Sequence, residues 1–202
     1  MEKSDTYKTI DQPTEASLYK EKGSKFFGYA FPVKTEEEVK NHLDDLKKEH
    51  HTARHWCYAY QLGTEKIVYR VNDDGEPNNS AGMPIYGQIQ SFDLTNILVV
   101  VVRYFGGTKL GVGGLIQAYK TASLLALESS SIIKRTVDKR IELKFEYKNM
   151  NKVMRLIKEH DLRIESQTME LDCRITLLVR KNIFTRIFEI FESQFEIGVK
   201  EL

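Results

Sequence analysis

The most constraining feature of this chain is an apolar run of six residues, 97–102, which offers a strand no polar position on either face. A strand that is apolar on both faces is buried on both sides of its sheet. The run therefore predicts a central strand over residues 96–105. It is also far shorter than the roughly 20 apolar residues that a membrane-spanning helix needs, so we expect no membrane span and no membrane partner.

Glycine and proline divide the chain into two parts. All four prolines lie in the first 84 residues, and eleven of the 12 glycines lie before residue 115. Beyond that point the sequence reads as regular elements with few turn residues. A chain of 202 residues allows one large domain or two small ones. We predict two domains, residues 1–135 and residues 136–202.

The second half alternates regularly. Apolar residues alternate with charged ones over 137–147, which is the period of a half-buried strand. Asn149 can cap a helix with an apolar face, and Asn182 opens a second helix of this kind. Further strands are indicated over 163–168, 169–179 and 195–200. The order βαββαβ predicts a ferredoxin-like domain.

The outward side of that predicted sheet carries charges. The strands over 137–147 and 169–179 place residues of both signs there, and no aromatic ring. RNA-recognition domains present rings on their central strands. We therefore expect a solvated face with salt bridges in place of an RNA-stacking platform; a protein contact surface is the alternative.

The first half is richer in turns. Gly23-Ser24 indicates a hairpin between strands over 16–22 and 25–33. Thr35 and Glu38 form the pattern of a capping box at the start of a helix. Strands over 55–62 and 67–72, a short helix over 84–90 and a longer helix from about Gly114 to Glu128 complete this half.

The segment that follows the apolar strand is a candidate anion site. Five glycines stand in nine residues, 106–114, before the predicted helix. Glycines let backbone N–H groups approach a ligand, and a helix N-terminus favours an anion. The segment is neither a P-loop nor a dinucleotide fingerprint, because Val112 and Gly113 stand where the first needs Lys and Ser or Thr, and Ile116 breaks the second. Tight turns and close packing explain the same glycines, so both interpretations stay open.

A second candidate is an acidic turn that contains Asp73, Asp74 and Glu76. Three carboxylates in four residues could hold a hard cation or act as a base, with His55 and Ser80 nearby. The EF-hand spacing is missing, and Asx-turn chemistry alone explains Asp-Asp-Gly. We favour the turn interpretation and leave a metal ion open. Cys57 is interpreted as a small core residue.

Overall composition narrows the class of protein. Thirty basic and 29 acidic side chains give a net charge of +1, which argues against a large nucleic-acid footprint but allows a local basic site. Two cysteines are too few for a disulfide framework or a four-cysteine zinc site. The polar N-terminus resembles no signal peptide, so we expect a cytoplasmic protein, and we expect no cofactor.

Several motifs occur together in the first half. They are His55-x-Cys57-x-Ala59, Asn72-Asp73-Asp74-Gly75-Glu76-Pro77, Ser80-Ala81-Gly82-x-Pro84-Ile85, and Val101-x-Arg103-Tyr104-Phe105-Gly106-Gly107-x-x-Leu110-Gly111-x-Gly113-Gly114-Leu115. With these motifs the chain resembles the IMPACT/YigZ family over about residues 15–130. The turn Gly23-Ser24-Lys25-Phe26 fits the same family. Two departures are Gln117, where many members have Arg, and Trp56, where a second His is common.

The resemblance implies an α+β fold. Its first domain would be like a ribosomal small-subunit protein domain and domain IV of elongation factor G, and its second like domain V of that factor. Eukaryotic relatives regulate translation under amino-acid starvation through an extra N-terminal domain, to which the resemblance does not extend. Bacterial relatives have no established enzymatic activity, and an RNA or ribosome role is proposed for them on structural grounds.

Three functions therefore compete. The first, which we favour, is a non-enzymatic RNA- or ribosome-associated protein in translation regulation, with these anion- or RNA-binding candidates: Arg103, Tyr104, Gly106, Gly107, Thr108, Lys109, Gly111, Gly113, Gly114 and Lys120. The second is an enzyme on a phosphorylated small molecule, with His55, Asp73, Asp74, Glu76 and Ser80 as an acidic site. The third is a protein-interaction module.

Overall fold

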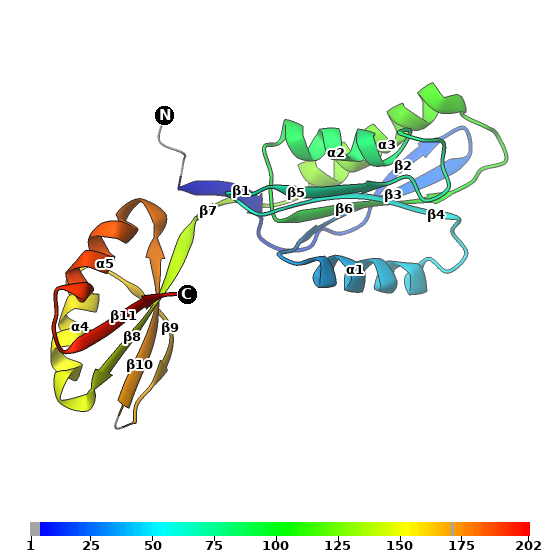
Figure 1. The fold of residues 1–202 in the computed structure, drawn as a ribbon. Helices are drawn as coiled ribbons and strands as arrows, with labels where there is room; N and C mark the ends of the chain where they lie inside the picture. The colour runs from blue at the N-terminus through cyan, green and yellow to red at the C-terminus, as the bar shows by residue number, and fades with distance from the viewer. Residues whose placement is uncertain (1–4, 171) are drawn as a thin grey trace. The chain divides into compact units, whose positions relative to one another are not determined.

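The computed structural model of the chain describes residues 5–170 and 172–202 (Figure 1). Leu171, which the alternation places in a strand, lies outside the described residues. The chain divides into two compact units. The first unit is Tyr7–Arg135, and the second contains residues 136–202 with Asp5 and Thr6.

The first unit is built on a five-stranded sheet in the order β2-β3-β6-β4-β5. All neighbouring strands are antiparallel. The strands are β2 (Ser17–Glu21), β3 (Ser24–Pro32), β4 (His55–Leu62), β5 (Val68–Asn72) and β6 (Ile97–Tyr104). The apolar run is thus the central strand β6, as the sequence predicts.

Both faces of β6 are covered by helices. Ile97, Val99 and Val101 pack under α2 (Gly82–Ser91) and α3 (Gly111–Glu128). Leu98, Val100 and Val102 pack on the other face, with α1 (Glu36–Glu49) (Figure 1). Each of these six side chains is fully buried, which is worth about 1.5–3 kcal/mol apiece. Continuous apolar strands are typical of parallel sheets, and here an antiparallel sheet is covered on both sides.

The start of helix α1 agrees with the sequence prediction, and the start of helix α3 differs from it. The Oγ1 atom of Thr35 accepts from the Glu38 N–H at 3.2 Å, which confirms the cap of α1. The Glu38 carboxylate accepts from the Lys34 N–H at 2.6 Å, one residue before the amide of a standard capping box. Helix α3 begins at Gly111, three residues before the predicted start. Three glycines of the glycine-rich segment therefore belong to the helix.

A two-stranded sheet of β1 (Thr6–Ile10) and β7 (Ile132–Thr136) was not expected from the sequence. Both strands are five residues long, and most of β7 is exposed, so neither shows a clear alternation. The pairing continues past β1, where the Asp11 N–H donates to the Ser131 carbonyl at 3.0 Å. Arg135 adds an ion pair with Asp11 at 3.4 Å.

The second unit has the predicted βαββαβ order. Its elements are β8 (Asp138–Glu146), α4 (Met150–Glu159), β9 (Arg163–Thr168), β10 (Asp172–Arg180), α5 (Phe184–Glu192) and β11 (Ile197–Glu201). The antiparallel sheet has the order β11-β8-β10-β9. Apolar residues of β8 and β10 pack against both helices in one core, which places α4 and α5 on the same face.

The helix starts predicted at Asn149 and Asn182 are confirmed in position for Asn149 only. Asn149 stands at the N-cap of α4, but its side chain makes no cap hydrogen bond. Helix α5 follows a 3-10 turn, Lys181–Ile183, so that Ile183 takes the N-cap position in place of Asn182. A single 3-10 turn precedes each helix. Its carbonyl groups accept from the first N–H group of the helix, at Met150 and at Phe184, in place of a side-chain cap.

The open face of the second unit carries ion pairs. Arg140 pairs with Glu165 at 2.7 Å, and Lys144 pairs with Asp172 at 3.4 Å. Exposed pairs of this kind contribute little to stability. No ring lies among the outward residues of β8 and β10 that the structure describes. Within the described residues, no helix combines the length and the apolar character needed to cross a bilayer.

Candidate functional site

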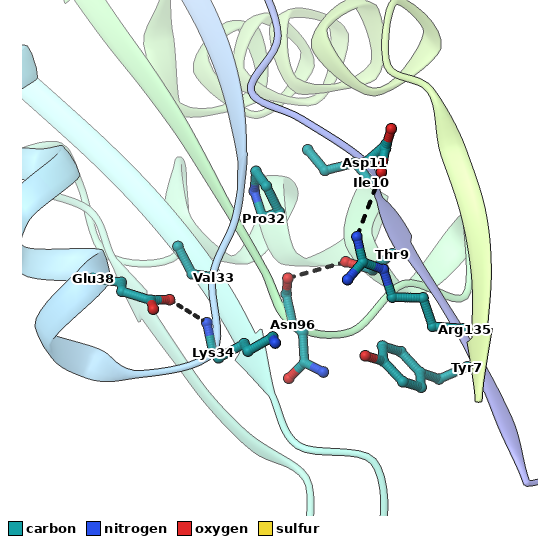
Figure 2. A pocket seen from close by; sticks show the side chains of 10 residues that line it. All are labelled: Tyr7, Thr9, Ile10, Asp11, Pro32, Val33, Lys34, Glu38, Asn96 and Arg135. Atoms are coloured by element: carbon teal, nitrogen blue, oxygen red, sulfur yellow. Dashed lines mark hydrogen bonds and ion pairs between the residues drawn. The ribbon is translucent and has the colours of Figure 1, made fainter. Parts of the chain in front are cut away.

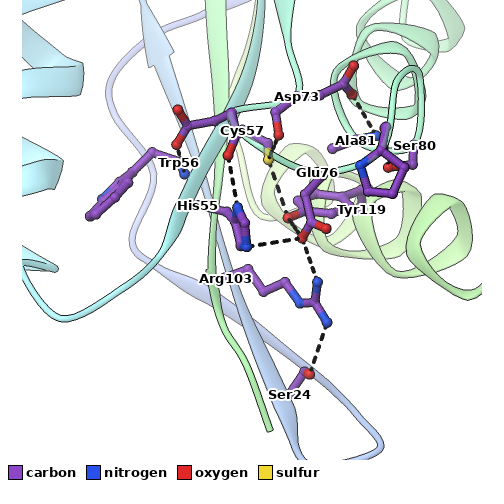
Figure 3. A network of polar contacts seen from close by, with 12 residues as sticks. Ser24, His55, Trp56, Cys57, Asp73, Glu76, Ser80, Ala81, Arg103 and Tyr119 are labelled. Carbon is purple, nitrogen blue, oxygen red and sulfur yellow. Dashed lines mark hydrogen bonds and ion pairs between the residues drawn. The ribbon is translucent and has the colours of Figure 1, made fainter. Parts of the chain in front are cut away.

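The carboxyl end of β6 brings both predicted sites together. Arg103 pairs with Phe26 of β3 on one side and with His55 of β4 on the other. The acidic turn follows β5 and returns to this end of β4, where the Asp74 carboxylate accepts from the Trp56 N–H at 2.7 Å. The glycine-rich segment leaves β6 at the same place. Residues far apart in sequence thus meet around Arg103 (Figure 3).

Arg103 is a buried ion-pair partner. Its Nη1 atom lies 2.6 Å from Oε1 of Glu76, and both side chains are about 5% exposed. Its Nη2 atom donates to Oγ of Ser24 at 3.4 Å, and its Nε has no hydrogen-bond partner. The guanidinium lies over the rings of Phe26 and Phe105, 5.4 and 5.6 Å from their centroids. Arg103 therefore joins the acidic turn to the glycine-rich segment and is not a free surface cation.

Glu76 is the centre of this buried network. The same Oε1 atom accepts from the Tyr119 hydroxyl of α3 at 2.8 Å. Nε2 of His55 lies 4.0 Å away, while its Nδ1 donates to the Asp74 carbonyl at 2.8 Å. Tyr119 also contacts Sγ of Cys57 at 3.3 Å. The network is what holds α3 and the acidic turn against the end of β6.

Burial sets the protonation of two groups in the network. Burial raises the pKa of the Cys57 thiol and of the Tyr119 phenol well above their usual values. Both groups are therefore protonated at neutral pH, and Cys57 is no thiolate nucleophile. The sequence interpretation of Cys57 as a core residue is confirmed, since its side chain is fully buried.

The other carboxylates of the acidic turn are occupied by backbone groups. Asp73 accepts from the N–H groups of Asn79, Ala81 and Gly82 at 2.8–2.9 Å, at the N-terminus of α2. The buried Ser80 hydroxyl donates to the Pro77 carbonyl at 2.6 Å. No cluster of His, Cys, Asp and Glu suited to a metal ion occurs in the part of the chain that the structure describes. The acidic side chains therefore stabilise the turn and the N-terminus of α2 by accepting backbone hydrogen bonds.

The glycines of the segment have different reasons to be glycine. A Cβ atom on Gly106 would lie 1.9 Å from the carbonyl carbon of Gly23, so close packing requires this glycine. Gly107 and Gly111 have φ of +88° and +70°, where other residues are strained. Gly114 is tight against Leu110, at 3.1 Å. Gly113 has neither constraint, because it is exposed and its Cβ would meet nothing within 4 Å.

The remaining candidates divide between the interior and the surface. Tyr104 is half-buried on the α1 side of the sheet, where its hydroxyl lies 2.9 Å from Nδ1 of His50. Thr108, Lys109 and Lys120 are exposed. The first turn of α3 has Leu110 as its N-cap, with no side-chain cap hydrogen bond and no acidic residue. Its exposed N–H groups beside Lys109 form a positively polarised surface.

A further cation was missed in the sequence. Gly106 lies against the hairpin turn of β2 and β3, and its N–H donates to Oγ of Ser24 at 3.1 Å. The exposed Lys22 belongs to that turn. The motif Gly23-Ser24-Lys25-Phe26 is the signal that could have linked the turn to the site. We define the glycine-segment surface as the exposed residues Lys22, Phe105, Gly106, Gly107, Thr108, Lys109 and Gly113.

A pocket of about 290 Å³ lies elsewhere in the first unit (Figure 2). It sits where β6 begins, and it is lined by residues that include Tyr7, Lys34, Asn96 and Arg135. None of the candidate site residues named from the sequence lines it. Since β6 spans eight residues, the pocket and the glycine-segment surface stand about 25 Å apart along the strand.

Comparison with known proteins places the site within a shared domain. The family model described as the Impact N-terminal domain matches residues 22–127, which include the whole buried network. The IMPACT family member YvyE of Bacillus subtilis is 33% identical over 76% of this chain and 70% of its own length. An IMPACT family member of Haemophilus influenzae is 32% identical over 90% of this chain and 88% of its own length. A crystal structure of a hypothetical protein, 23% identical, covers 98% of each chain with a TM-score of 0.74, which shows a shared fold.

Proposed function

Because the chain belongs to the IMPACT family, we propose that it is a non-enzymatic, cytoplasmic protein of translation regulation that contacts RNA, free or on the ribosome. The contact is the glycine-segment surface, with Lys120 of α3 as an additional cation. Backbone N–H groups and lysines bind phosphate without reading sequence, so the binding is general for RNA backbones.

The observation that carries this proposal is the N-terminus of α3. Its first turn is exposed and has no side-chain cap, and Gly113 has no packing reason to lack a side chain. A glycine at an exposed helix start lowers helix stability, which a close backbone approach by a phosphate would explain. Lys109 and Lys22 supply formal charge at the same surface. Few cations are involved, which agrees with a net charge of only +1.

The buried network favours binding over catalysis. An enzyme on a phosphorylated molecule would need a base beside the glycine-rich segment. The Glu76 carboxylate accepts hydrogen bonds from Arg103 and Tyr119, and the Asp73 carboxylate accepts from three backbone N–H groups. Both carboxylates are therefore engaged in structural hydrogen bonds. These side chains therefore stabilise the part of the fold that carries the glycine-segment surface.

We further propose a fold analogy for each unit. The first unit resembles a ribosomal small-subunit protein domain and domain IV of elongation factor G, and the second is ferredoxin-like. The sheet order β11-β8-β10-β9, with both helices on one face, supports the second analogy. Domains of those kinds work on the ribosome, which suits an RNA contact through the first unit.

Sedimentation with ribosomes and with bulk RNA tests the proposal. With about three phosphate contacts, affinity should fall roughly 20- to 40-fold between 50 and 200 mM salt, the smaller figure applying to single strands. Lys109→Glu should weaken binding about tenfold and lower the salt slope by about 1. Arg103 is unsuitable for this test because it is buried.

The matched control is Lys40→Glu, an exposed lysine of α1 on the opposite face of the sheet. It makes the same charge change and should sediment like the wild type. The proposal fails if the wild type stays in the supernatant at low salt, or if both variants lose binding equally.

A further inference from the structure

Phe105 is the one aromatic ring of the glycine-segment surface, and its side chain is 44% exposed. We infer that the RNA bound at this surface is single-stranded and that Phe105 stacks on one of its bases. This inference rests on the proposed function. It adds the kind of nucleic acid and a contact that phosphate binding does not supply.

The ring of Phe105 is held in place from one side. The Arg103 guanidinium lies 5.6 Å from its centroid and 5.4 Å from the centroid of the buried Phe26. Arg103 is in turn fixed by Glu76 at 2.6 Å. An exposed ring with a fixed orientation loses little conformational entropy when a base packs on it.

Gly107 leaves room for a base near Phe105. A Cβ atom there would meet nothing within 4 Å, whereas Gly106 packs against the hairpin turn. Tyr69, an exposed ring of β5, provides a contrast, because it is already stacked on Tyr86 at 4.4 Å between centroids. The contact that the structure gives for the Phe105 ring is thus with a cation, and the open position Gly107 is two residues away.

Stacking and phosphate contacts would work together here. Lys109 lies four residues after Phe105, and Lys22 belongs to the turn that touches Gly106. In single-stranded RNA, unstacked bases pack on aromatic side chains while lysines contact the adjoining phosphates. Bases inside a duplex are stacked on each other and offer no face to the ring. The site should therefore prefer a single strand to a duplex of the same length.

Fluorescence anisotropy with two labelled RNAs tests this preference in the full chain. The probes are a non-self-complementary single strand of about 12 nucleotides and its duplex, at equal ionic strength. The wild type should bind the single strand more tightly. Phe105→Leu, which keeps an apolar side chain but removes the ring, should weaken single-strand binding about tenfold and leave the duplex and the salt slope unchanged.

Two further variants separate stacking from structure. Phe105→Trp keeps a ring and should retain single-strand binding. Phe195→Leu makes the same change at a fully exposed phenylalanine of the second unit and should have no effect. Because Phe105 also covers Arg103, the midpoint of thermal unfolding is measured for each variant, and Phe105→Trp serves as the folded reference.

The outcomes distinguish this inference from the proposed function. If Phe105→Leu binds the single strand like the wild type while Lys109→Glu weakens it, the stacking inference is overturned and phosphate binding stands. An equal loss for single strand and duplex also overturns it, because the ring then acts through the shape of the surface. If the wild type binds neither RNA at low salt, both the inference and the proposed function fail.

Discussion

Replacing Glu76 by glutamine should lower the free energy of unfolding of the first unit by about 3–5 kcal/mol, because it leaves the buried Arg103 guanidinium without its counter-charge. Arg103→Met should cost a similar amount, since it leaves the buried Glu76 carboxylate with a hydrogen bond from Tyr119 and with His55 4.0 Å away, but without its closest counter-charge. The double variant should lose clearly less than the sum of the two, because it leaves neither charge unpaired. Such non-additivity is the signature of a buried pair.

Urea unfolding followed by tryptophan fluorescence measures this cycle. Trp56 is the protein's single tryptophan, and it lies on β4 beside the network, so its signal reports on the first unit. Lys48→Met removes an exposed partner of Asp45 on α1 and should leave the transition in place. Additive losses in the double variant would contradict the view that Glu76 and Arg103 stabilise the fold as a pair.

The regular parts of the fold follow from the sequence for a physical reason. Strand β6 is apolar on both faces, and β8 alternates along its length, so burial and periodicity agree with local pattern. The β1-β7 sheet has no such pattern, because both strands are short, β7 is largely exposed, and the two buried residues of β1 are adjacent. Helix α3 was predicted to start too late, since glycine disfavours helices in general and gives no signal where a helix begins on Gly111.

The site could be predicted only in part. The sequence identifies the acidic turn and the glycine-rich segment as unusual, but not their connection. Arg103 meets Glu76 because antiparallel pairing places it opposite His55 and Phe26, a register that no local pattern specifies. Local spacing likewise does not show that Asp73 serves the start of α2. Burial changes the role of Arg103 from a ligand contact to a structural ion pair.

Replacing Gly106 by alanine should destabilise the first unit by more than about 4 kcal/mol, or prevent its folding. The new Cβ atom would lie 1.9 Å from the carbonyl carbon of Gly23 and 2.2 Å from the Ser24 nitrogen. Both are backbone atoms of the hairpin turn, so no side chain can rotate away to relieve the clash. The turn or the glycine-rich segment must move, which also separates Arg103 from Ser24.

Gly113→Ala is the matched variant, seven residues further along the same segment. Its Cβ atom meets nothing within 4 Å, so stability should be unchanged or rise by up to about 1 kcal/mol, because alanine is the better helix former. RNA binding should nevertheless weaken, since the added methyl group occupies the space in which a phosphate approaches the first turn of α3. Urea unfolding and RNA anisotropy on the two variants measure both effects. If Gly113→Ala leaves RNA affinity as it is in the wild type, close backbone approach is not the reason for this glycine, while a wild-type unfolding midpoint for Gly106→Ala would refute its packing role.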